Sequence, residues 1–189
     1  MMQELGYNFL MIKLKGGFML TELFLVKPSK EYQESFREYV LAYKSINDEY
    51  YFNKYHKALE NFTDFLTELE SDSTIINPKY GVLTSTFWLI NDKNVVGVVR
   101  VRHEEIGTAG HIGYDISPQY RKKGFGNYIL KLALIEAAKI GITEAIVTCS
   151  IDNAYSRKII ENNGGNLLGT IYDPEDKEYF NKFKIVILP

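Results

Sequence analysis

The stretch ISPQYRKKGFGNYIL, residues 116–130, constrains the fold of this chain more than any other part of the sequence. An apolar run ends at Ile116, three cations follow at residues 121–123, and Gly124 and Gly126 precede a segment with helical spacing. A plain turn needs one glycine at most and no cluster of charge. We therefore interpret the junction as the end of a strand, a glycine-rich loop and the start of a helix.

The chemistry of such a junction favours an anion. The first N–H groups of a helix have no partner within the helix and carry partial positive charge. Glycine has no Cβ, so a ligand can approach the backbone closely, and the cations of residues 121–123 add charge at the same place. We predict a pocket for phosphate or pyrophosphate at this helix N-terminus. The alternative is a solvated turn whose charge serves solubility.

Two familiar phosphate motifs fail on spacing. A Walker loop has four residues between its glycines and then Gly-Lys-Ser/Thr, and nothing in the chain matches it. A dinucleotide fingerprint needs a third glycine where Ile129 stands, and it belongs near the start of a β-α unit rather than two-thirds along the chain. The loop therefore calls for another class of phosphate ligand.

The length and composition describe one domain. At 189 residues, with 46% hydrophobic and 24% charged residues, the chain has the make-up of an ordinary globular protein. A net charge of -2 argues against a protein that mainly holds nucleic acid. The single cysteine, Cys149, excludes an intramolecular disulfide and suits a reducing compartment, and no apolar run approaches the roughly 20 residues that span a bilayer. We expect a cytoplasmic protein that binds neither nucleic acid nor membrane.

Residues 1–18 are hard to reconcile with a secretion signal, because two lysines interrupt the apolar stretch and no small-residue cleavage site follows. A Lys-Gly-Gly triplet just upstream of Met19 is what a purine-rich ribosome-binding site encodes when it is translated in frame. Our hypothesis is that Met19 is the natural first residue, that residues 1–18 are a non-native or flexible extension, and that residues 19–189 form a single domain. Mass spectrometry of protein from its native host tests this, and an N-terminus at Met1 would contradict it.

The residue patterns predict a mixed sheet with helices on its faces. Runs of β-favouring residues predict strands, and apolar residues at helical spacing predict helices. The expected strands are 21–26, 84–90, 95–103, 111–116, 144–150, 166–172 and 182–188, and the expected helices are about 29–46, 55–70, 126–140 and 153–162. Ser29 and Gly164 are expected to cap helices, and residues 91–94 to form a tight hairpin turn. The order is β-α-α-β-β-β-α-β-α-β-β, an α/β (α+β) fold without the regular alternation of a doubly wound one.

The motif Arg-x-x-Gly-x-Gly, which begins at Arg121 just after a strand and Pro118, resembles the signature of the GCN5-related N-acetyltransferases (GNAT). In that family Gln/Arg-x-x-Gly-x-Gly/Ala binds the pyrophosphate of acetyl-coenzyme A (acetyl-CoA). The likeness extends over residues 102–165, RHEEIGTAGHIGYDISPQYRKKGFGNYILKLALIEAAKIGITEAIVTCSIDNAYSRKIIENNGG, which resemble a bacterial branch of predicted acetyltransferases nearly throughout. This stretch is about a third of the chain, and the element order fits the family's fold over most of the rest.

The resemblance implies a GNAT-type sheet, mixed and mostly antiparallel with helices on both faces, and acetyl-CoA as the cofactor, without a metal. It implies that Ile116 and Ser117 offer backbone partners to the pantetheine arm, and that Asn153 and Ser156 lie near the pantetheine and the thiol. The loop that wraps the pyrophosphate, mostly through main-chain N–H groups, is implied to be Arg121, Lys122, Lys123, Gly124, Phe125, Gly126 and Asn127.

Several residues have an ordinary structural interpretation as well. Asn153 can simply cap a helix, which does not exclude contact with a cofactor. Arg157 can reach a phosphate, but a helical arginine is usually just exposed. Cys149 lies in an apolar run and is expected to be inert core, and His56 is expected to be structural.

The catalytic groups are less clearly marked. Relatives that use a carboxylate base often place it on the strand before the phosphate loop. Here that strand reads GHIGYDI, with no Glu and with Asp115 expected to face away from Tyr114. The tyrosine that many relatives place seven residues after the asparagine is Ile160 in this chain. Both usual roles are therefore unfilled at their usual places.

Other candidates lie close to the predicted hairpin. His103 and Glu104 end one strand and His111 begins the next, so the hairpin is predicted to bring two histidines and a carboxylate together. A histidine near its usual pKa of about 6.5 can act as a base at neutral pH. The alternative is that the two histidines stabilise the hairpin. Tyr155 or Tyr179 is a candidate acid, and a water chain can replace all of them.

The predicted function is acetyl transfer from acetyl-CoA to a primary amine of a small molecule or a peptide, by a monomer or a homodimer. The acceptor is expected between the N-terminal helices, the loop at 71–80 and the C-terminal hairpin. There Tyr50, Tyr51, Phe52 and Tyr55 can line a pocket or simply pack the core. One alternative is a non-catalytic acyl-CoA sensor, because the loop is intact while the usual base and acid are missing. A second alternative is a nucleotide-binding regulatory domain.

Overall fold

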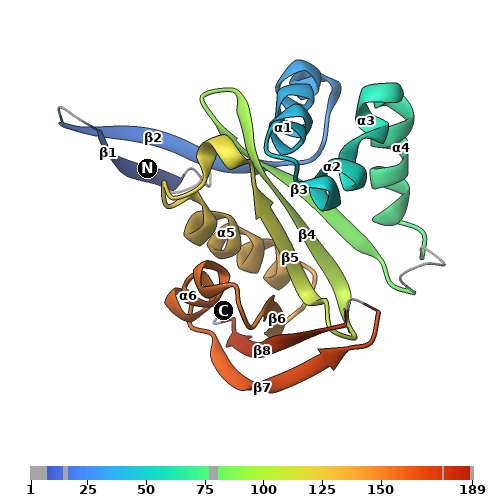
Figure 1. The fold of residues 1–189 in the computed structure, drawn as a ribbon, viewed down its shortest axis with the longest axis vertical. Coiled ribbons are helices and arrows are strands. Elements are labelled where there is room, and N and C mark those ends of the chain that lie inside the picture. The colour runs from blue at the N-terminus through green and yellow to red at the C-terminus, as the bar shows by residue number, and fades with distance from the viewer. Residues whose placement is uncertain (1–7, 15–16, 77–80, 176, 188–189) are drawn as a thin grey trace.

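The computed structural model of the chain describes residues 8–14, 17–76, 81–175 and 177–187. Its centre is a sheet whose strands follow the order β1-β2-β3-β4-β5-β6-β8-β7 (Figure 1). The strands are β1 (Asn8–Leu14), β2 (Gly17–Val26), β3 (Thr84–Asn91), β4 (Asn94–Ile106), β5 (Gly110–Ile116), β6 (Glu144–Ser150), β7 (Asn166–Asp173) and β8 (Glu178–Val186).

The sheet is mixed and mostly antiparallel, which confirms the predicted fold class. Each neighbouring pair is antiparallel except β5 and β6, which run parallel. Between β3 and β4, Asp92 and Lys93 both have positive φ, 46° and 66°. Positive φ at both central residues is the geometry of a type I′ hairpin turn, so the turn predicted at residues 91–94 is confirmed.

Helices cover both faces of this sheet (Figure 1). Those of the N-terminal half pack on one face and those of the C-terminal half on the other. They are α1 (Gln33–Ser45), α2 (Glu49–Tyr55), α3 (Lys57–Glu60), α4 (Phe62–Asp72), α5 (Phe125–Lys139) and α6 (Ala154–Asn162), with short 3-10 turns at Lys30–Tyr32 and Pro118–Tyr120.

The two faces carry separate cores because successive side chains of a strand point to opposite sides. On β3, Trp88 and Ile90 pack with α1–α4, whereas Phe87 and Leu89 pack on the α5 side. Trp88 is fully buried and stacks on Phe36 of α1, with ring centroids 4.4 Å apart. A ring pair of this kind adds about 1 kcal/mol to the burial of its area, which helps to dock α1 on the sheet.

The segment between α1 and β3 departs from the single helix predicted at 55–70. Asn61 is extended, with φ −145° and ψ 97°, and its Oδ1 accepts hydrogen bonds from the N–H groups of Thr63 and Asp64. An asparagine in this role starts a new helix, so the chain forms α3 and α4, with α2 before them. Ser29, expected as a helix cap, precedes a 3-10 turn, and its side chain makes no capping hydrogen bond.

The N-terminal strand is longer than predicted. The strand expected at 21–26 is the second half of β2, and β1 pairs with its first half. Residues 1–7 and 15–16 of the expected extension, and residues 77–80 of the expected loop, lie outside the described part of the chain. None of the described helices combines the length and apolarity needed to cross a membrane.

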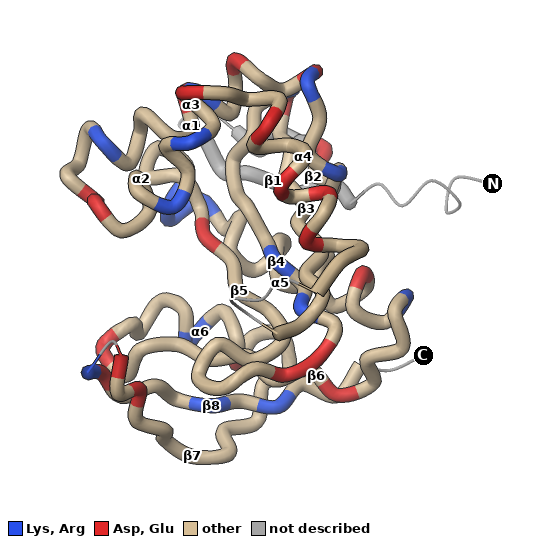
Figure 2. Tube along the Cα trace, turned by 90° about the vertical axis from the view of Figure 1, so that its right-hand side faces the viewer, with Lys and Arg blue, Asp and Glu red and all other residues tan. Residues whose placement is uncertain are grey.

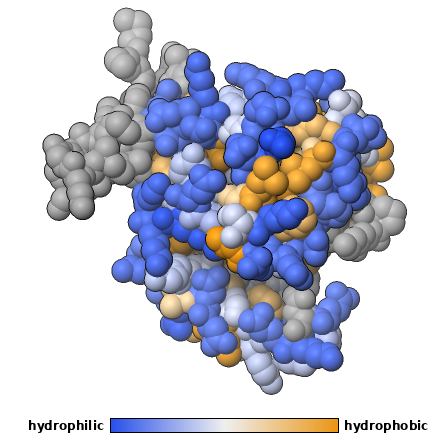
Figure 3. Space-filling view, turned by 45° about the horizontal axis from the view of Figure 1, so that its top comes forward, coloured by the Kyte–Doolittle hydropathy of each residue, from blue (hydrophilic) through white to orange (hydrophobic). Residues whose placement is uncertain are grey.

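Seen from the side, α1–α4 lie in one part of the molecule and α6, β7 and β8 in another, and β4 and β5 connect the two (Figure 2). Basic and acidic residues are interspersed in both parts (Figure 2). The face in Figure 3 is mostly hydrophilic, and its apolar side chains gather in a limited area. A surface of this kind is ordinary for a folded domain.

Candidate active site

The parallel strands β5 and β6 separate at the candidate site. Their register has one paired position, Ile112 with Val147, whereas β5 stays paired with β4 as far as Ile116, opposite Gly97. Among the described strands, none pairs with this edge in the carboxyl half of β5. Such an edge offers backbone N–H and C=O groups to an extended ligand, which is the arrangement that the resemblance implies for the pantetheine arm.

The loop after β5 presents a run of backbone N–H groups. Lys122 and Gly124 both have left-handed backbone conformations, with φ of 62° and 89°, and Gly124 is the N-cap of α5. Left-handed residues in a tight loop make a concave run of N–H groups that suits anions. No described residue accepts a hydrogen bond from the N–H groups of residues 122–126. The loop therefore fits a pyrophosphate, whose oxygens accept several hydrogen bonds at once.

The two loop glycines serve different purposes. An added Cβ at Gly124 would meet nothing within 4 Å, so glycine is needed there for its backbone conformation. An added Cβ at Gly126 would lie 2.5 Å from Cδ1 of Ile159, so glycine there lets the Ile159 side chain of α6 pack closely on α5. Gly126 therefore also serves helix packing, and its place in the cofactor loop stays a prediction.

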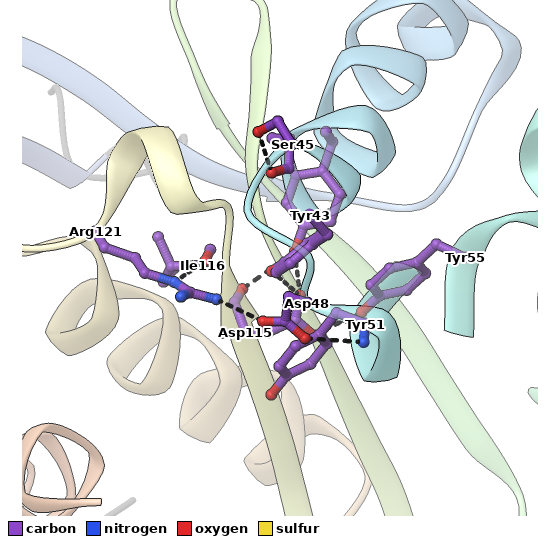
Figure 4. A network of polar contacts seen from close by, with 10 residues as sticks. Tyr43, Ser45, Asp48, Tyr51, Tyr55, Asp115, Ile116 and Arg121 are labelled. Atoms are coloured by element: carbon purple, nitrogen blue, oxygen red, sulfur yellow. Dashed lines mark hydrogen bonds and ion pairs between the residues drawn. The ribbon is translucent and has the colours of Figure 1, made fainter. Parts of the chain in front are cut away.

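The three cations of the loop have different neighbours. Nζ of Lys122 lies 5.8 Å from the ring centre of Tyr155, and Nζ of Lys123 lies 5.1 Å from that of Tyr120. Both lysines are exposed beside the N-terminus of α5. Arg121 turns toward α1 and α2 instead (Figure 4). Two of the three predicted cations therefore remain free to meet a ligand at the loop.

Other members of the implied cofactor set have structural partners. Phe125 is buried and anchors α5 in the core. Oδ1 of Asn127 accepts a hydrogen bond from Nδ2 of Asn162 at 3.2 Å, which ties the start of α5 to the end of α6. Ser117 is buried, its N–H donates to the carbonyl of Val96 at 3.0 Å, and its hydroxyl has no partner among the described residues. The side chains of Phe125 and Asn127 therefore hold the loop in place.

Helix α6 begins beside the open edge of β5. Oδ1 of Asn153 accepts a hydrogen bond from the N–H of Ser156 at 2.9 Å, so Asn153 caps the helix as expected. The hydroxyl of Ser156 lies 3.3 Å from the hydroxyl of Tyr114 on β5. Cys149 on β6 is buried, and burial raises the pKa of its thiol, which confirms the interpretation as inert core.

The two histidine candidates engage different neighbours. Nε2 of His103 lies 3.0 Å from Oγ of Ser85 on β3. Nδ1 of His111 accepts a hydrogen bond from the N–H of Ile146 on β6, at 2.9 Å. These contacts lie on opposite sides of the β4–β5 pair, so the structure does not join the two rings into one cluster. A catalytic role for either histidine stays a prediction.

The remaining candidates lie at the surface. Glu104 is exposed near the end of β4. Tyr155 is 70% exposed on α6, beside Lys122. Tyr179 is half exposed on β8, and its ring packs against that of Tyr172. None of these contacts aligns an acid with the open edge of β5, and the roles of Glu104 and Tyr155 stay predictions.

His111 gives the fold a pH dependence. Burial lowers the pKa of His111, with Arg102 and Lys182 adding to the effect and Glu105 opposing it. The unfolded chain then binds a proton at His111 more readily than the folded chain does. The contribution of neutral His111 to the free energy of unfolding is therefore complete above the unfolded pKa of about 6.5 and declines as the pH falls below it. We expect the urea midpoint to fall between pH 7.5 and pH 5.5, and to fall less in His111→Asn.

The asparagine variant is chosen because its Oδ1 can still accept the hydrogen bond from Ile146 and does not titrate. His103 and His56 are present in both proteins, so the difference between the two urea profiles isolates His111. Equal falls in the two proteins would contradict this assignment.

A buried polar cluster beneath α1 and α2 is absent from the sequence-based prediction. Asp115 of β5, 5% exposed, accepts hydrogen bonds from the hydroxyls of Tyr39, Tyr43 and Tyr55. Figure 4 labels Asp115 with Tyr43 and Tyr55. The contacts from Tyr43 and Tyr55 measure 2.8 and 2.6 Å. Arg100 of β4 lies 3.8 Å from the Asp115 carboxylate and donates to the Tyr55 hydroxyl. We call these five residues the Asp115 cluster.

The Asp115 cluster is closed to substrates. Burial and then the Asp115 carboxylate raise the pKa of Tyr39 and Tyr43, so both hydroxyls stay protonated donors at neutral pH. The carboxylate is enclosed by these donors and is not placed to take a proton from an amine. The expectation that Asp115 faces away from Tyr114 is confirmed, since the Tyr114 hydroxyl meets α6 on the other face.

Comparisons with known proteins agree with this geometry. The family described as Acetyltransferase (GNAT) domain matches residues 23–166, which is most of the chain. None of the curated proteins is similar enough in sequence to count as a match.

Solved structures share the fold at low sequence identity. An acetyl transferase from Salmonella typhimurium, which modifies the N-terminal serine of 50S ribosomal subunit protein L7/L12, has a TM-score of 0.62 at 17% identity, over 88% of this chain and 95% of that one. The microcin C7 self immunity acetyltransferase MccE, in complex with acetyl-CoA and AMP, has a TM-score of 0.67 at 16% identity, over 87% and 92%. A spermidine N-acetyltransferase SpeG chimera from Vibrio cholerae and hSSAT has a TM-score of 0.58 at 15% identity, over 87% and 93%.

The family match spans the parts that build the candidate site. Residues 23–166 include β5, the loop of residues 121–127, α5, β6 and α6. The structural likenesses independently give the same fold. The chain therefore belongs to the GNAT acetyltransferases, the enzymes that transfer an acetyl group from acetyl-CoA to an amine.

Proposed function

We propose that residues 122–126 hold the pyrophosphate of acetyl-CoA and that the acetyl group passes to a primary amine of a small molecule or a peptide. The observation that carries the proposal is the run of five N–H groups at the N-terminus of α5 that no described residue satisfies. We extend it to a bacterial cytoplasmic enzyme, a monomer or a homodimer. The buried free thiol of Cys149 supports a reducing compartment.

The residues of the chain supply binding and orientation. The partial positive charge at the start of the 15-residue α5 attracts the pyrophosphate, and the exposed Lys122 and Lys123 add to it. The open edge of β5 offers backbone groups beside Tyr114 and Ile116. When bound, acetyl-CoA supplies the acetyl group as an activated thioester. The work left to the protein is to align an amine with that thioester and to remove a proton from it.

The acceptor side is formed by α1 and α2, and Tyr51 is the residue best placed to meet an amine. Of the four aromatic residues predicted there, Tyr55 is buried in the Asp115 cluster, Phe52 packs against the core and Tyr50 is 67% exposed. The Tyr51 ring is half-buried and stacks on Tyr43, with centroids 4.9 Å apart. Its hydroxyl has no hydrogen-bond partner among the described residues and points away from the Asp115 cluster (Figure 4).

The Tyr51 hydroxyl suits an amine. Burial raises the pKa of Tyr51, so the hydroxyl stays neutral at physiological pH. A neutral hydroxyl can accept a hydrogen bond from an ammonium group and donate one to a carbonyl. The side chain therefore has the chemistry to hold the nucleophile before and after it loses its proton.

Two amine probes follow from the structural relatives. One relative modifies an N-terminal serine and another carries the name of a spermidine acetyltransferase. A short peptide with an N-terminal serine and spermidine itself therefore represent the peptide and small-molecule classes. Release of the free thiol of coenzyme A in the presence of either probe reports acetyl transfer.

Tyr51→Phe separates an acceptor contact from a packing role. The variant keeps the stacked ring and loses the hydroxyl, so we expect acceptor kcat/KM to fall about tenfold, as for the loss of one hydrogen bond to a charged group. The dissociation constant for acetyl-CoA should stay within about twofold. Tyr50→Phe, on the exposed neighbour in the same helix, serves as the control and should change neither quantity. Equal acceptor kcat/KM values in the two variants would show that the Tyr51 hydroxyl does not contact the acceptor.

A non-catalytic acyl-CoA sensor is the second candidate, and one observation favours it. The strand before the phosphate loop carries one carboxylate, Asp115, and that carboxylate is enclosed in its cluster. Ile160 stands where many relatives have the tyrosine that acts as the acid, and it is fully buried. The sensor and the enzyme share the cofactor loop and differ in turnover.

Calorimetric titration of acetyl-CoA, followed by the thiol assay with both probes, tests these proposals. Micromolar binding with turnover supports the enzyme, and binding without turnover of any amine favours the sensor. Tighter binding of ATP or NAD than of coenzyme A would favour a nucleotide-binding regulatory domain. If folded protein binds none of them, the cofactor proposal is withdrawn.

A further inference from the structure

Arg121 joins the cofactor loop to the helices of the acceptor side. Its Nε donates a hydrogen bond to the carbonyl of Ile116 at 3.1 Å, and its Nη2 lies 3.5 Å from Oδ2 of Asp48 (Figure 4). The guanidinium also lies over the ring of Tyr43, 5.6 Å from its centre. One side chain thus contacts β5, the start of α2 and the end of α1.

Asp48 serves the loop and α2 at the same time. Its Oδ1 accepts a hydrogen bond from the N–H of Tyr51 at 3.3 Å, which caps α2, while its Oδ2 pairs with Arg121. On the other side of the guanidinium, the Tyr43 hydroxyl donates to Asp115 at 2.8 Å. A continuous set of contacts therefore runs from the start of the loop to the helix that carries Tyr51.

The combination matters more than the ion pair alone. Arg121 is 42% exposed and Asp48 is 23% exposed, and an exposed ion pair by itself is a weak contact. Here the same guanidinium also holds a backbone carbonyl and a ring, so the loss of one partner loosens the others. A loop that is held in its binding conformation beforehand loses less conformational freedom when the ligand arrives. By linkage, a ligand in the loop must then stabilise the elements to which the loop is tied.

We propose that Arg121 is a positioning residue that, through Asp48, couples acetyl-CoA binding at the loop to the placement of α2 and Tyr51. The inference rests on the proposed function, because the cofactor in the loop is the ligand whose binding is coupled. It also goes beyond that function. It assigns part of the cofactor affinity to Asp48, which lies outside the Arg-x-x-Gly-x-Gly motif, and it makes the acceptor side respond to the cofactor.

The opposite arrangement is that Asp48 draws Arg121 away from a phosphate. The two arrangements differ in sign. Removal of the Asp48 charge weakens acetyl-CoA binding if Arg121 supports the loop, and strengthens it if Asp48 competes with the phosphate for the guanidinium.

A double-mutant cycle on acetyl-CoA affinity distinguishes them. The proteins are the unmodified chain, Asp48→Asn, Arg121→Gln and the double variant, titrated with acetyl-CoA by calorimetry. Asparagine caps helices as well as aspartate does, so Asp48→Asn removes the charge and keeps the cap of α2. Glu49→Gln removes the same charge from the next, exposed residue and is the matched control.

We expect each single variant to raise the dissociation constant about fivefold to tenfold, the low end of couplings between sites. The double variant should bind no more weakly than Arg121→Gln, and Glu49→Gln should stay within about twofold of the unmodified chain. Hydrogen exchange supplies a readout that a merely structural role would not move. Acetyl-CoA should slow exchange of the α2 amides in the unmodified chain and slow it less in Asp48→Asn.

The outcomes separate this inference from the function on which it rests. Unchanged or tighter binding by Asp48→Asn overturns the inference alone, as do additive effects in the double variant. An equal slowing of α2 exchange in both proteins overturns the link to the acceptor side. If the unmodified chain does not bind acetyl-CoA at all, the proposed function fails and the inference fails with it.

Discussion

The Gly124→Asp variant should bind acetyl-CoA at least about 100-fold more weakly than the unmodified chain, which corresponds to about 2.7 kcal/mol. Gly124 has a φ of 89° and caps α5, so any Cβ strains the loop by about 1–2 kcal/mol. The new carboxylate also lies where the pyrophosphate is proposed to bind. Two unit charges 4 Å apart interact by about 4 kcal/mol near a protein surface, so repulsion alone is large enough to account for a loss of this size.

A steric clash at residue 124 does not cause the expected loss of acetyl-CoA binding, and Gly141→Asp is the matched control. A Cβ at Gly124 would meet nothing within 4 Å, and the same is true of Gly141, just beyond the other end of α5, whose φ is 86°. Gly141→Asp therefore carries the same backbone strain and the same charge far from the loop. It should lower the melting temperature, since a carboxylate at a helix C-terminus is unfavourable, and leave the dissociation constant unchanged.

Calorimetry on the three proteins decides the role of the loop. Loss of binding in Gly124→Asp with retention in Gly141→Asp places the anion at the N-terminus of α5. Equal affinity in all three would mean that the N–H groups of residues 122–126 do not hold the cofactor. Equal loss in both variants would trace the effect to a general loss of stability instead.

The part of the site that could be predicted from the sequence is the part that is local in the chain. The strand end at Ile116, the glycine-rich loop and the start of α5 lie within a short stretch. An apolar run, two glycines and a helical spacing mark them in turn. The order of strands β2 to β8 along the chain followed in the same way from local patterns, whereas β1 was not predicted. The packing role of Gly126 could not be predicted, because the close approach of Ile159 to Gly126 depends on how α6 packs on α5.

The part that could not be predicted depends on contacts between distant segments. Tyr39 and Tyr43 lie one helical turn apart, and Asp115 is the only carboxylate in the predicted strand 111–116, so each was visible in the sequence. No local pattern predicts that the two tyrosines contact Asp115, because this contact requires α1 to cross the sheet above the end of β5. The break at Asn61 was missed for a related reason, since an asparagine on the polar face of a helix and one that caps a new helix look alike in sequence.

Loss of the Asp115 carboxylate should remove about 3–5 kcal/mol of folding free energy. Asp115→Ala leaves the hydroxyls of Tyr39, Tyr43 and Tyr55 without their acceptor and leaves the buried Arg100 without its counter-ion. Each buried group that loses its partner keeps its desolvation penalty and no longer has a hydrogen bond or ion pair that compensates for it. A typical domain has only about 5–15 kcal/mol of stability in total, so this variant should lie near the limit of folding.

Urea unfolding followed by the fluorescence of Trp88 measures the effect directly. Trp88 is the single tryptophan of the chain, is fully buried, and packs in the same core as Tyr39, Tyr43 and Tyr55. Asp152→Ala removes an exposed carboxylate and should change the stability by no more than about 0.5 kcal/mol. If Asp115→Ala does not fold, Asp115→Asn, which keeps the shape and one acceptor oxygen, provides a milder loss on the same scale.

The Arg100→Met change tests whether the cost is electrostatic. In the Asp115→Ala background it removes the unpaired charge, so the double variant should lose clearly less stability than the sum of the two single variants. Additive losses would mean that Arg100, 3.8 Å from the carboxylate, does not depend on Asp115 as its counter-ion. A loss below about 1 kcal/mol in Asp115→Ala would mean that water replaces the carboxylate, and that the Asp115 cluster is open to solvent rather than a closed support for the end of β5.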